Sequence, residues 1–160
     1  MRHGFSLMET VIALAVLAVS VPLVFLALEK GGRAGMASAT DSRCARMADA
    51  CLEEIRASQE SRARWLPNEN PGAPIPPEGS FWALAFSNEG HVMGQINADQ
   101  WAAGVAHIDG EAVRYLASMD SDSRVLEGMP VMRRVRVTVE EPAAAAQENR
   151  AKSKFYTLMP

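Results

Sequence analysis

The chain has 160 residues, a length that suits one domain with a modest core of its own. Its formal net charge of −3 leaves no basic footprint of the kind that nucleic acids require, so no nucleic-acid partner is predicted. The two cysteines, Cys44 and Cys51, are too few for a disulfide scaffold and show no zinc-type spacing, and neither a metal nor a cofactor is expected.

One apolar segment dominates the N-terminus. Residues 5–28 carry a single charge, Glu9, and are long enough as a helix to cross about 30 Å of hydrocarbon. The segment is apolar on every side, and a chain of this length has no core large enough to bury such a helix. We therefore predict a transmembrane helix over 5–28, with Pro22 inside it at a position that bends helices.

Three other interpretations of this segment each leave a feature unexplained: a signal peptide, a core helix and a plain anchor. A secretory signal peptide should end soon after its apolar stretch, whereas the Ala-x-Ala of residues 37–39 lies beyond Glu29 and Lys30. A buried core helix is disfavoured by the length of the segment. A plain single-pass anchor stays open, but it gives no reason for an acid near the start of the span. Glu9 either reaches the headgroups or is paired, because an unpaired carboxylate at the edge of a bilayer is unfavourable.

The first nine residues carry a recognisable pattern: the short basic leader Met1-Arg2-His3-Gly4, followed by Phe5-Ser6-Leu7-Met8-Glu9. This pattern resembles the N-terminal signal of type IV prepilins and pseudopilins. The resemblance implies a leader peptide over 1–4, cleavage by a prepilin peptidase between Gly4 and Phe5, and N-methylation of Phe5. It also implies that Glu9 pairs with the N-terminal amine of a neighbouring subunit during assembly, which would relieve the cost of a lone charge.

Residues 29–61 are predicted to continue the helix in amphipathic form. Three glycines in residues 31–35 predict a hinge or local melting. One apolar stripe then follows with helical spacing: Cys44, Ala48, Cys51, Leu52 and Ile55. We expect this stripe to pack on the C-terminal domain; a free coiled-coil stalk is weaker, because the stripe lasts about two heptads. This part of the chain is similar to PilV-type minor pilins and to the I-type pseudopilin.

The two cysteines lie within the stripe. They are seven residues apart, so they share a helical face two turns apart and cannot bridge while the segment is helical. They either fill the helix seam as small apolar side chains or pair between subunits.

Residues 62–79 form the next segment, a connector in which five prolines in thirteen residues predict an exposed, stiff loop. A proline-rich ligand for a groove is the less favoured interpretation.

Residues 80–160 are predicted to be rich in β-structure. Segments 81–86 and 91–93 flank a hairpin loop at 87–90, and further strands are expected at 111–119, 132–140 and 155–159. In 132–140 the side chains alternate, with valines 135, 137 and 139 on one face and Arg134, Arg136 and Thr138 on the other, wet face. The predicted class is α+β, a long N-terminal helix packed on a small antiparallel sheet. The resemblance implies this pilin-like layout as much as the periodicity does.

Candidate chemistry in this domain is sparse. His91 and His107 have no ligand-spaced partner and are predicted at the surface. Residues 120–123, Asp-Ser-Asp-Ser, are predicted to form a solvated turn; a calcium loop like that of major pseudopilins is a weak match. The arginines of the fourth strand form either a solvated face or a subunit contact: Arg133, Arg134 and Arg136. The sequence has no nucleophile elbow, P-loop or metalloprotease motif, and no enzymatic activity is predicted.

The C-terminal sequence carries a second resemblance. Residues 135–145, Asn149-Arg150 and 155–159 are similar to the cassette-encoded pilin-like B proteins of verrucomicrobia. That similarity implies one member of a co-encoded set of pilin-like proteins.

Together these features predict a minor type IV pilin-like or pseudopilin subunit. Its partners would be a prepilin peptidase, other pilin or pseudopilin subunits and inner-membrane lipid. It would sit in the inner membrane as a single-pass protein with its C-terminal domain in the periplasm, and then enter a pilus or secretion pseudopilus. The alternative is a stand-alone single-pass membrane protein with an extracytoplasmic binding domain; a membrane-tethered enzyme is a third and weaker hypothesis.

Overall fold

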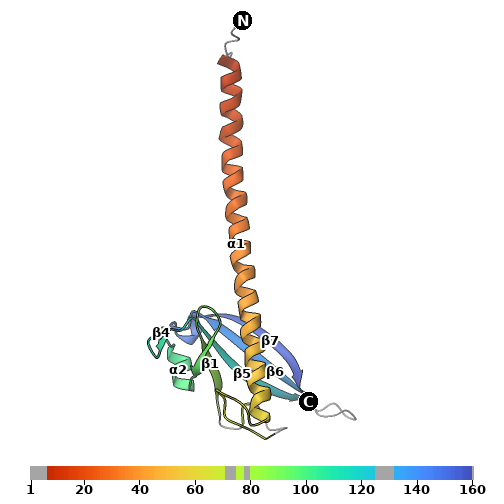
Figure 1. Ribbon diagram of the computed structural model, residues 1–160. Helices are drawn as coiled ribbons and strands as arrows, with labels where there is room; N and C mark the ends of the chain where they lie inside the picture. Colours follow the sequence, from red (N-terminus) through yellow and green to blue (C-terminus); the bar gives the residue numbers. More distant parts are fainter. Residues whose placement is uncertain (1–6, 71–74, 78–79, 125–131, 160) are drawn as a thin grey trace. The chain divides into compact units, whose positions relative to one another are not determined.

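The computed structural model describes residues 7–70, 75–77, 80–124 and 132–159, without the side chains at 33, 34, 36, 37, 122–124 and 132 (Figure 1). The chain divides into two compact units, Met1–Thr40 and Asp41–Pro160. Helix α1 (Leu7–Gln59) contributes its first part to one unit and its second part to the other.

The first unit is helical from Leu7 onward. Helix α1 includes Pro22 and passes through Gly31, Gly32 and Gly35 without a break, so the local melting predicted at the glycines is not seen. Between Leu7 and Gly32 every side chain is exposed except Ser20, which is half-buried.

In the second unit, α1 buries one stripe of side chains. The predicted members Cys44, Ala48, Cys51 and Ile55 are buried and Leu52 is half-buried, which confirms the amphipathic interpretation. The stripe is wider than predicted, because Met47 and Ser58 are also fully buried. The Ser58 hydroxyl, in the last turn of α1, donates a hydrogen bond to the carbonyl oxygen of Pro67 in the connector that follows the helix.

Five antiparallel strands form the main sheet, in the order β2-β1-β5-β6-β7. These are β1 (Trp82–Phe86), β2 (Val92–Gln95), β5 (Tyr115–Arg124), β6 (Met132–Glu141) and β7 (Ala151–Met159). The predicted β1–β2 hairpin is confirmed, with Gly90 at a φ of 88° in its loop. The predicted strand 111–119 is divided in two, because β4 (Glu111–Ala112) pairs with β3 (His107–Ile108) in a separate small sheet.

The sheet has two differently covered faces. The inner face packs on the second part of α1, and their shared core is Cys44, Met47, Ala48, Cys51, Ile55, Leu66, Ile75, Trp82, Leu84, Phe86, Tyr115, Ala117, Met119, Val135, Val137, Val139 and Met159. This packing confirms the predicted α+β class. The outer face is partly covered by α2 (Ala98–Ala103) over a smaller core of Ala83, Ala85, Ile96, Trp101, Val105, Val113, Leu116 and Ala143.

Helix α2 was not predicted from the sequence. It is held by a capping box, in which the Asn97 side chain accepts from the Gln100 backbone at 2.8 Å and the Gln100 side chain accepts from the Asn97 backbone at 3.0 Å. Its side chain Trp101 is buried and lies edge-on to Phe81, with ring centroids 5.7 Å apart. A short 3-10 turn, η1 (Gln147–Asn149), precedes β7.

Three predictions about the strands were wrong in detail. Residues 120–123 continue β5 as far as Arg124 and pair with β6, so they are not a solvated turn. Strand alternation places Arg133 on the valine side of β6 and not beside Arg134 and Arg136. Thr138, expected on the wet face, is only 8 % exposed.

The connector also departs from its prediction of an exposed loop. Its described residues, 62–70 and 75–77, contain no helix or strand, as expected. However, Leu66 and Ile75 are buried in the core beneath α1, and the Ile75 backbone N–H donates to the Ser121 hydroxyl at 3.1 Å. The connector therefore closes one end of the inner core instead of running freely over the surface.

Candidate functional sites

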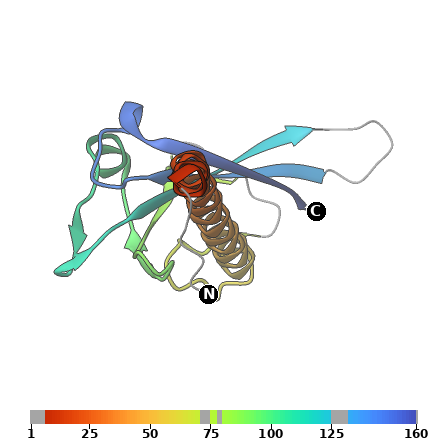
Figure 2. The same cartoon turned by 90° about the horizontal axis from the view of Figure 1, so that it is seen from above.

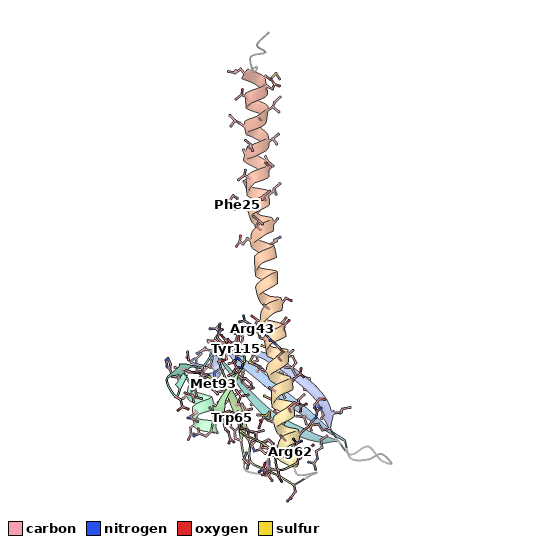
Figure 3. All side chains as sticks on the ribbon, in the orientation of Figure 1. Phe25, Arg43, Arg62, Trp65, Met93 and Tyr115 are labelled. Carbon is pink, nitrogen blue, oxygen red and sulfur yellow. The ribbon has the colours of Figure 1, made fainter. Side chains whose placement is uncertain are left out.

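The apolar part of α1 is the first candidate site. Leu7–Gly32 is, within the described residues, one helix long and apolar enough to cross a membrane, and none of it is buried in the structure. Figure 3 shows its side chains, Phe25 among them, standing out from the helix. A helix apolar all round and left exposed requires a lipid or protein environment. The segment therefore suits a membrane anchor or a signal sequence at the N-terminus.

The predicted processing residues lie around the start of this helix. Gly4 and Phe5 fall outside the described residues. Glu9 lies in the first turn of α1, with its side chain exposed. An acid in the first turn also complements the positive end of the helix dipole. Glu9 thus lies among the apolar side chains at the start of α1. The nearest basic residue along the helix is Lys30, so a cation that pairs with Glu9 would have to come from outside α1.

The two cysteines behave as core residues. Cys44 is 3 % exposed and Cys51 is fully buried, and both are free thiols. Burial raises the pKa of both thiols, and Ser153, which hydrogen-bonds the Cys44 thiol, partly opposes that rise. Because neither sulfur is accessible in the folded unit, the geometry favours the helix-seam interpretation over pairing between subunits.

A buried ionic cluster links β6, β7 and α2, and sequence reasoning missed it. The Arg150 guanidinium donates to Glu140 at 3.1 Å, to the Ala145 carbonyl at 2.7 Å, and to the Trp101 carbonyl. Lys152 contacts the second oxygen of Glu140 at 3.1 Å. Glu140 and Arg150 are 2 % and 5 % exposed, so this cluster fixes the segment before β7 against α2 and is a structural element.

The open part of the outer face carries a surface that we name the basic patch: Arg134, Arg136, Lys154, Tyr156 and Leu158. Strand register places Arg134 opposite Leu158 and Arg136 opposite Tyr156. Asp120 holds Arg136 through two contacts, at 3.0 and 2.9 Å, and the Arg134 guanidinium lies 5.7 Å from the centre of the Tyr156 ring. Asp122, in register with Arg134, has a side chain outside the described residues.

A second surface, the acidic groove, lies between the β1–β2 loop and the β3–β4 hairpin. Its floor contains the half-buried side chains Val92, Met93 and Ile108, and its rim carries the exposed acids Glu89, Asp109 and Glu111. The groove has a volume of about 740 Å³, which admits more than one side chain. Figure 3 labels Met93 on this side of the domain.

The histidines and Asp120 are the remaining candidates from the sequence. His91 and His107 are exposed, as predicted, and His91 Nε2 lies 3.4 Å from the Glu89 carboxylate. In the described part of the chain no group of three or more His, Cys, Asp and Glu side chains is placed to hold a metal. Asp120 is engaged by Arg136 and lies in a strand, which does not suit a calcium loop.

Comparisons of this chain with protein-family models, curated proteins and solved structures found no match. The architecture itself, a long apolar N-terminal helix whose continuation packs on an antiparallel sheet, is compatible with pilin-like proteins.

Proposed function

We propose that this protein is a minor type IV pilin-like or pseudopilin subunit, processed by a prepilin peptidase and assembled into a pilus or secretion pseudopilus. In this proposal the apolar helix holds the chain in the inner membrane and the α+β unit lies in the periplasm before assembly. The chain then acts as a structural component and has no catalytic role.

The observation that carries the proposal is the position of the leader pattern relative to the helix. The Gly4-Phe5 junction directly precedes a helix that begins at Leu7 and exposes apolar side chains on all sides, with Glu9 as its acid. Cleavage at that junction would leave a new amine about one helical turn before Glu9, free to pair with the Glu9 carboxylate of a neighbouring copy. The amphipathic continuation, packed on the sheet, supplies the rigid body that such a subunit presents outside the membrane.

A stand-alone single-pass membrane protein is the alternative. It shares the anchor and the folded unit, and the acidic groove would then serve as its binding surface. This alternative differs from the pilin-like proposal in one respect that is simple to measure, because it requires no processing of the N-terminus.

Processing is tested by the intact mass of the full chain expressed with and without a prepilin peptidase. We expect loss of residues 1–4 and one added methyl group only when the peptidase is present. Gly4→Leu should abolish the cleavage, because the peptidase acts after glycine in the family that the leader resembles. Retention of the four residues beside an active peptidase and a control prepilin that is cut would reject the proposal in favour of the single-pass alternative.

A further inference from the structure

We propose that the free edge of β7 accepts an extended segment of a partner subunit, which pairs with it as a sixth strand of the main sheet. The inference rests on the proposed function, because that function supplies the partner subunits. It adds to that function the element at which a partner joins and the conformation of the joining segment.

The backbone of β7 is paired on one side. This strand is the outermost one of the sheet and runs beside the second part of α1 (Figures 1 and 2). Its register with β6 is continuous over all nine residues, and within the described residues its backbone makes no hydrogen bond outside that ladder. Alternate N–H and C=O groups of β7 therefore face away from the sheet. Another strand is the partner that can satisfy such a row of groups.

The second half of β7 lacks the features that usually protect an edge. Edge strands are commonly short, interrupted by a bulge or a proline, or charged. The opposite edge of this sheet follows that rule, because β2 has four residues and its pairing with β1 shifts in register between Ala85 and Phe86. In β7 the two charges, Lys152 and Lys154, lie in the first half, and residues 155–159 contain neither a charge nor a proline. This half of the edge is open to pairing.

Apolar side chains lie on both faces beside this half of the edge. On the outer face, Tyr156 and Leu158 are the large hydrophobic side chains that stand exposed in the described part of the second unit, at 55 % and 61 %. On the inner face, a cavity of about 240 Å³ lies between α1 and β7, with the half-buried side chains of Leu52 and Phe155 in its lining.

These observations together identify the partner as a strand. Successive side chains of a strand point to opposite faces of its sheet. A sixth strand would therefore place one set of side chains over Tyr156 and Leu158 and the other set at the inner cavity, while its backbone pairs with β7. A flat apolar surface or a small apolar ligand would cover one face and leave the backbone groups unpaired. The segment that fits carries apolar side chains on both faces beside residues 155–159, and an acid beside Lys154, which is exposed and forms no ion pair within the described residues.

The first test fills the edge from within the chain. An Asn-Gly turn and a strand of alternating threonine and valine replace Pro160, so that the added strand can fold back onto β7 as a hairpin. We expect every second backbone amide of residues 151–159 to become protected from hydrogen exchange. The chain should be cleaved normally but should pellet with its partner subunits about tenfold less, because its edge is no longer free. A paired edge with normal assembly, or an added strand that leaves these amides unprotected, would overturn the proposal.

The matched control carries the same extension with proline in place of each valine. Proline has no backbone N–H and cannot enter a ladder, so amide exchange in β7 and assembly should both stay as in the unmodified chain. Reduced assembly of this control would mean that the added length is responsible and not the paired edge, which contradicts the proposal.

A single charge provides the second test. Leu158→Lys places a cation where the joining segment brings an apolar side chain, and assembly should fall about tenfold. Ala102→Lys adds the same charge at an exposed position on α2 and should assemble normally. Urea denaturation should give both variants the stability of the unmodified chain, since both side chains are exposed. Equal assembly of the two variants would contradict a contact at this edge.

Hydrogen exchange of the unmodified chain separates the remaining outcomes. The outward amides of β7 should exchange rapidly in the processed chain alone in detergent, and they should be protected in the pelleted assembly. Protection in the chain alone, together with dimer formation, would assign the edge to a second copy and overturn the partner segment. The intact mass of each sample reports cleavage after Gly4. A processed chain that pellets without protection of β7 rejects the edge contact alone, whereas an unprocessed chain rejects the proposed function.

Discussion

At the scale of single residues, Glu9 is the side chain whose environment matters most. It is exposed in the first turn of α1, where residues 7–28 carry no other charge, and a lone carboxylate in lipid is unfavourable. If a neighbouring amine neutralises it, the charge is needed for assembly and not for the cleavage that we propose between Gly4 and Phe5.

We therefore expect Glu9→Ala to be cleaved and methylated nearly normally but to enter filaments at least about tenfold less, since a missing ion pair removes several kcal/mol where the charges are desolvated. The fraction of the chain that pellets with its partner subunits measures this. Glu29→Ala, an acid at the far end of the same apolar segment, is the control and should assemble normally. Normal assembly of the Glu9 variant would remove the pairing hypothesis.

Arg150 is the residue on which the fold of the second unit depends most visibly. Its guanidinium donates hydrogen bonds to the Glu140 carboxylate and to two backbone carbonyl oxygens. The side chains of Glu140 and Arg150 are both almost fully buried from solvent. Removing the cation leaves a buried carboxylate with only Lys152, which is itself 39 % exposed.

Arg150→Met should lower the free energy of unfolding by about 3 kcal/mol, the lower part of the range for breaking a buried ion pair, because Lys152 remains. Urea denaturation of the full chain in detergent measures it. Arg56→Met removes an exposed partner of Glu53 and should cost about 1 kcal/mol or less. The double variant Glu140→Leu with Arg150→Met should be more stable than Arg150→Met alone; equal or lower stability would show that the uncompensated charge is not the cause.

At the scale of elements, the second part of α1 illustrates what periodicity predicts well. Apolar positions three and four residues apart fall on one helix face, and that face is the one the sheet buries. Met47 lies three residues after Cys44 and four before Cys51, so it fits the apolar pattern and was omitted from the prediction without a physical reason. Ser58 was missed because a polar serine adds nothing to an apolar pattern. Ser58 is buried because its hydroxyl is satisfied by Pro67.

This packing predicts a strong contrast along one helix. Ile55→Ala should destabilise the second unit by about 2–5 kcal/mol, because a fully buried side chain leaves a cavity. Arg46→Ala, exposed on the same helix, should change stability by no more than about 0.5 kcal/mol. Chemical denaturation followed by circular dichroism compares the two, and similar losses would mean that α1 does not carry the core.

Helix α2 and the end of β5 show where local patterns were insufficient. The Asn97-x-x-Gln100 spacing is a capping signal that can be recognised in the sequence. However, the six residues of α2 are too few to show a helical period of apolar side chains. Residues 120–123 resemble a polar turn in isolation. They form a strand because β6 pairs with them residue by residue, and that pairing satisfies their backbone groups.

At the scale of the whole molecule, the order of the strands decides which side chains become a surface. Strand β1 pairs with both β2 and β5, and β5 pairs with β6, so the sheet has its hairpin loop and its last strand at opposite edges. The acidic groove and the basic patch are separated for this reason. Neither surface is visible along the sequence, because each combines residues from elements that are distant in the chain.

The sequence alone determined the apolar N-terminal helix, its amphipathic continuation, the first hairpin and the valine face of β6. These depend on local composition and on periods of two or about 3.6 residues, which a single segment displays by itself. Only the tertiary structure decided the burial of Glu140 with Arg150, the placement of Arg133 away from the patch, and the position of the patch and α2 on one sheet face. Those outcomes depend on strand register and long-range contact, which no local pattern specifies.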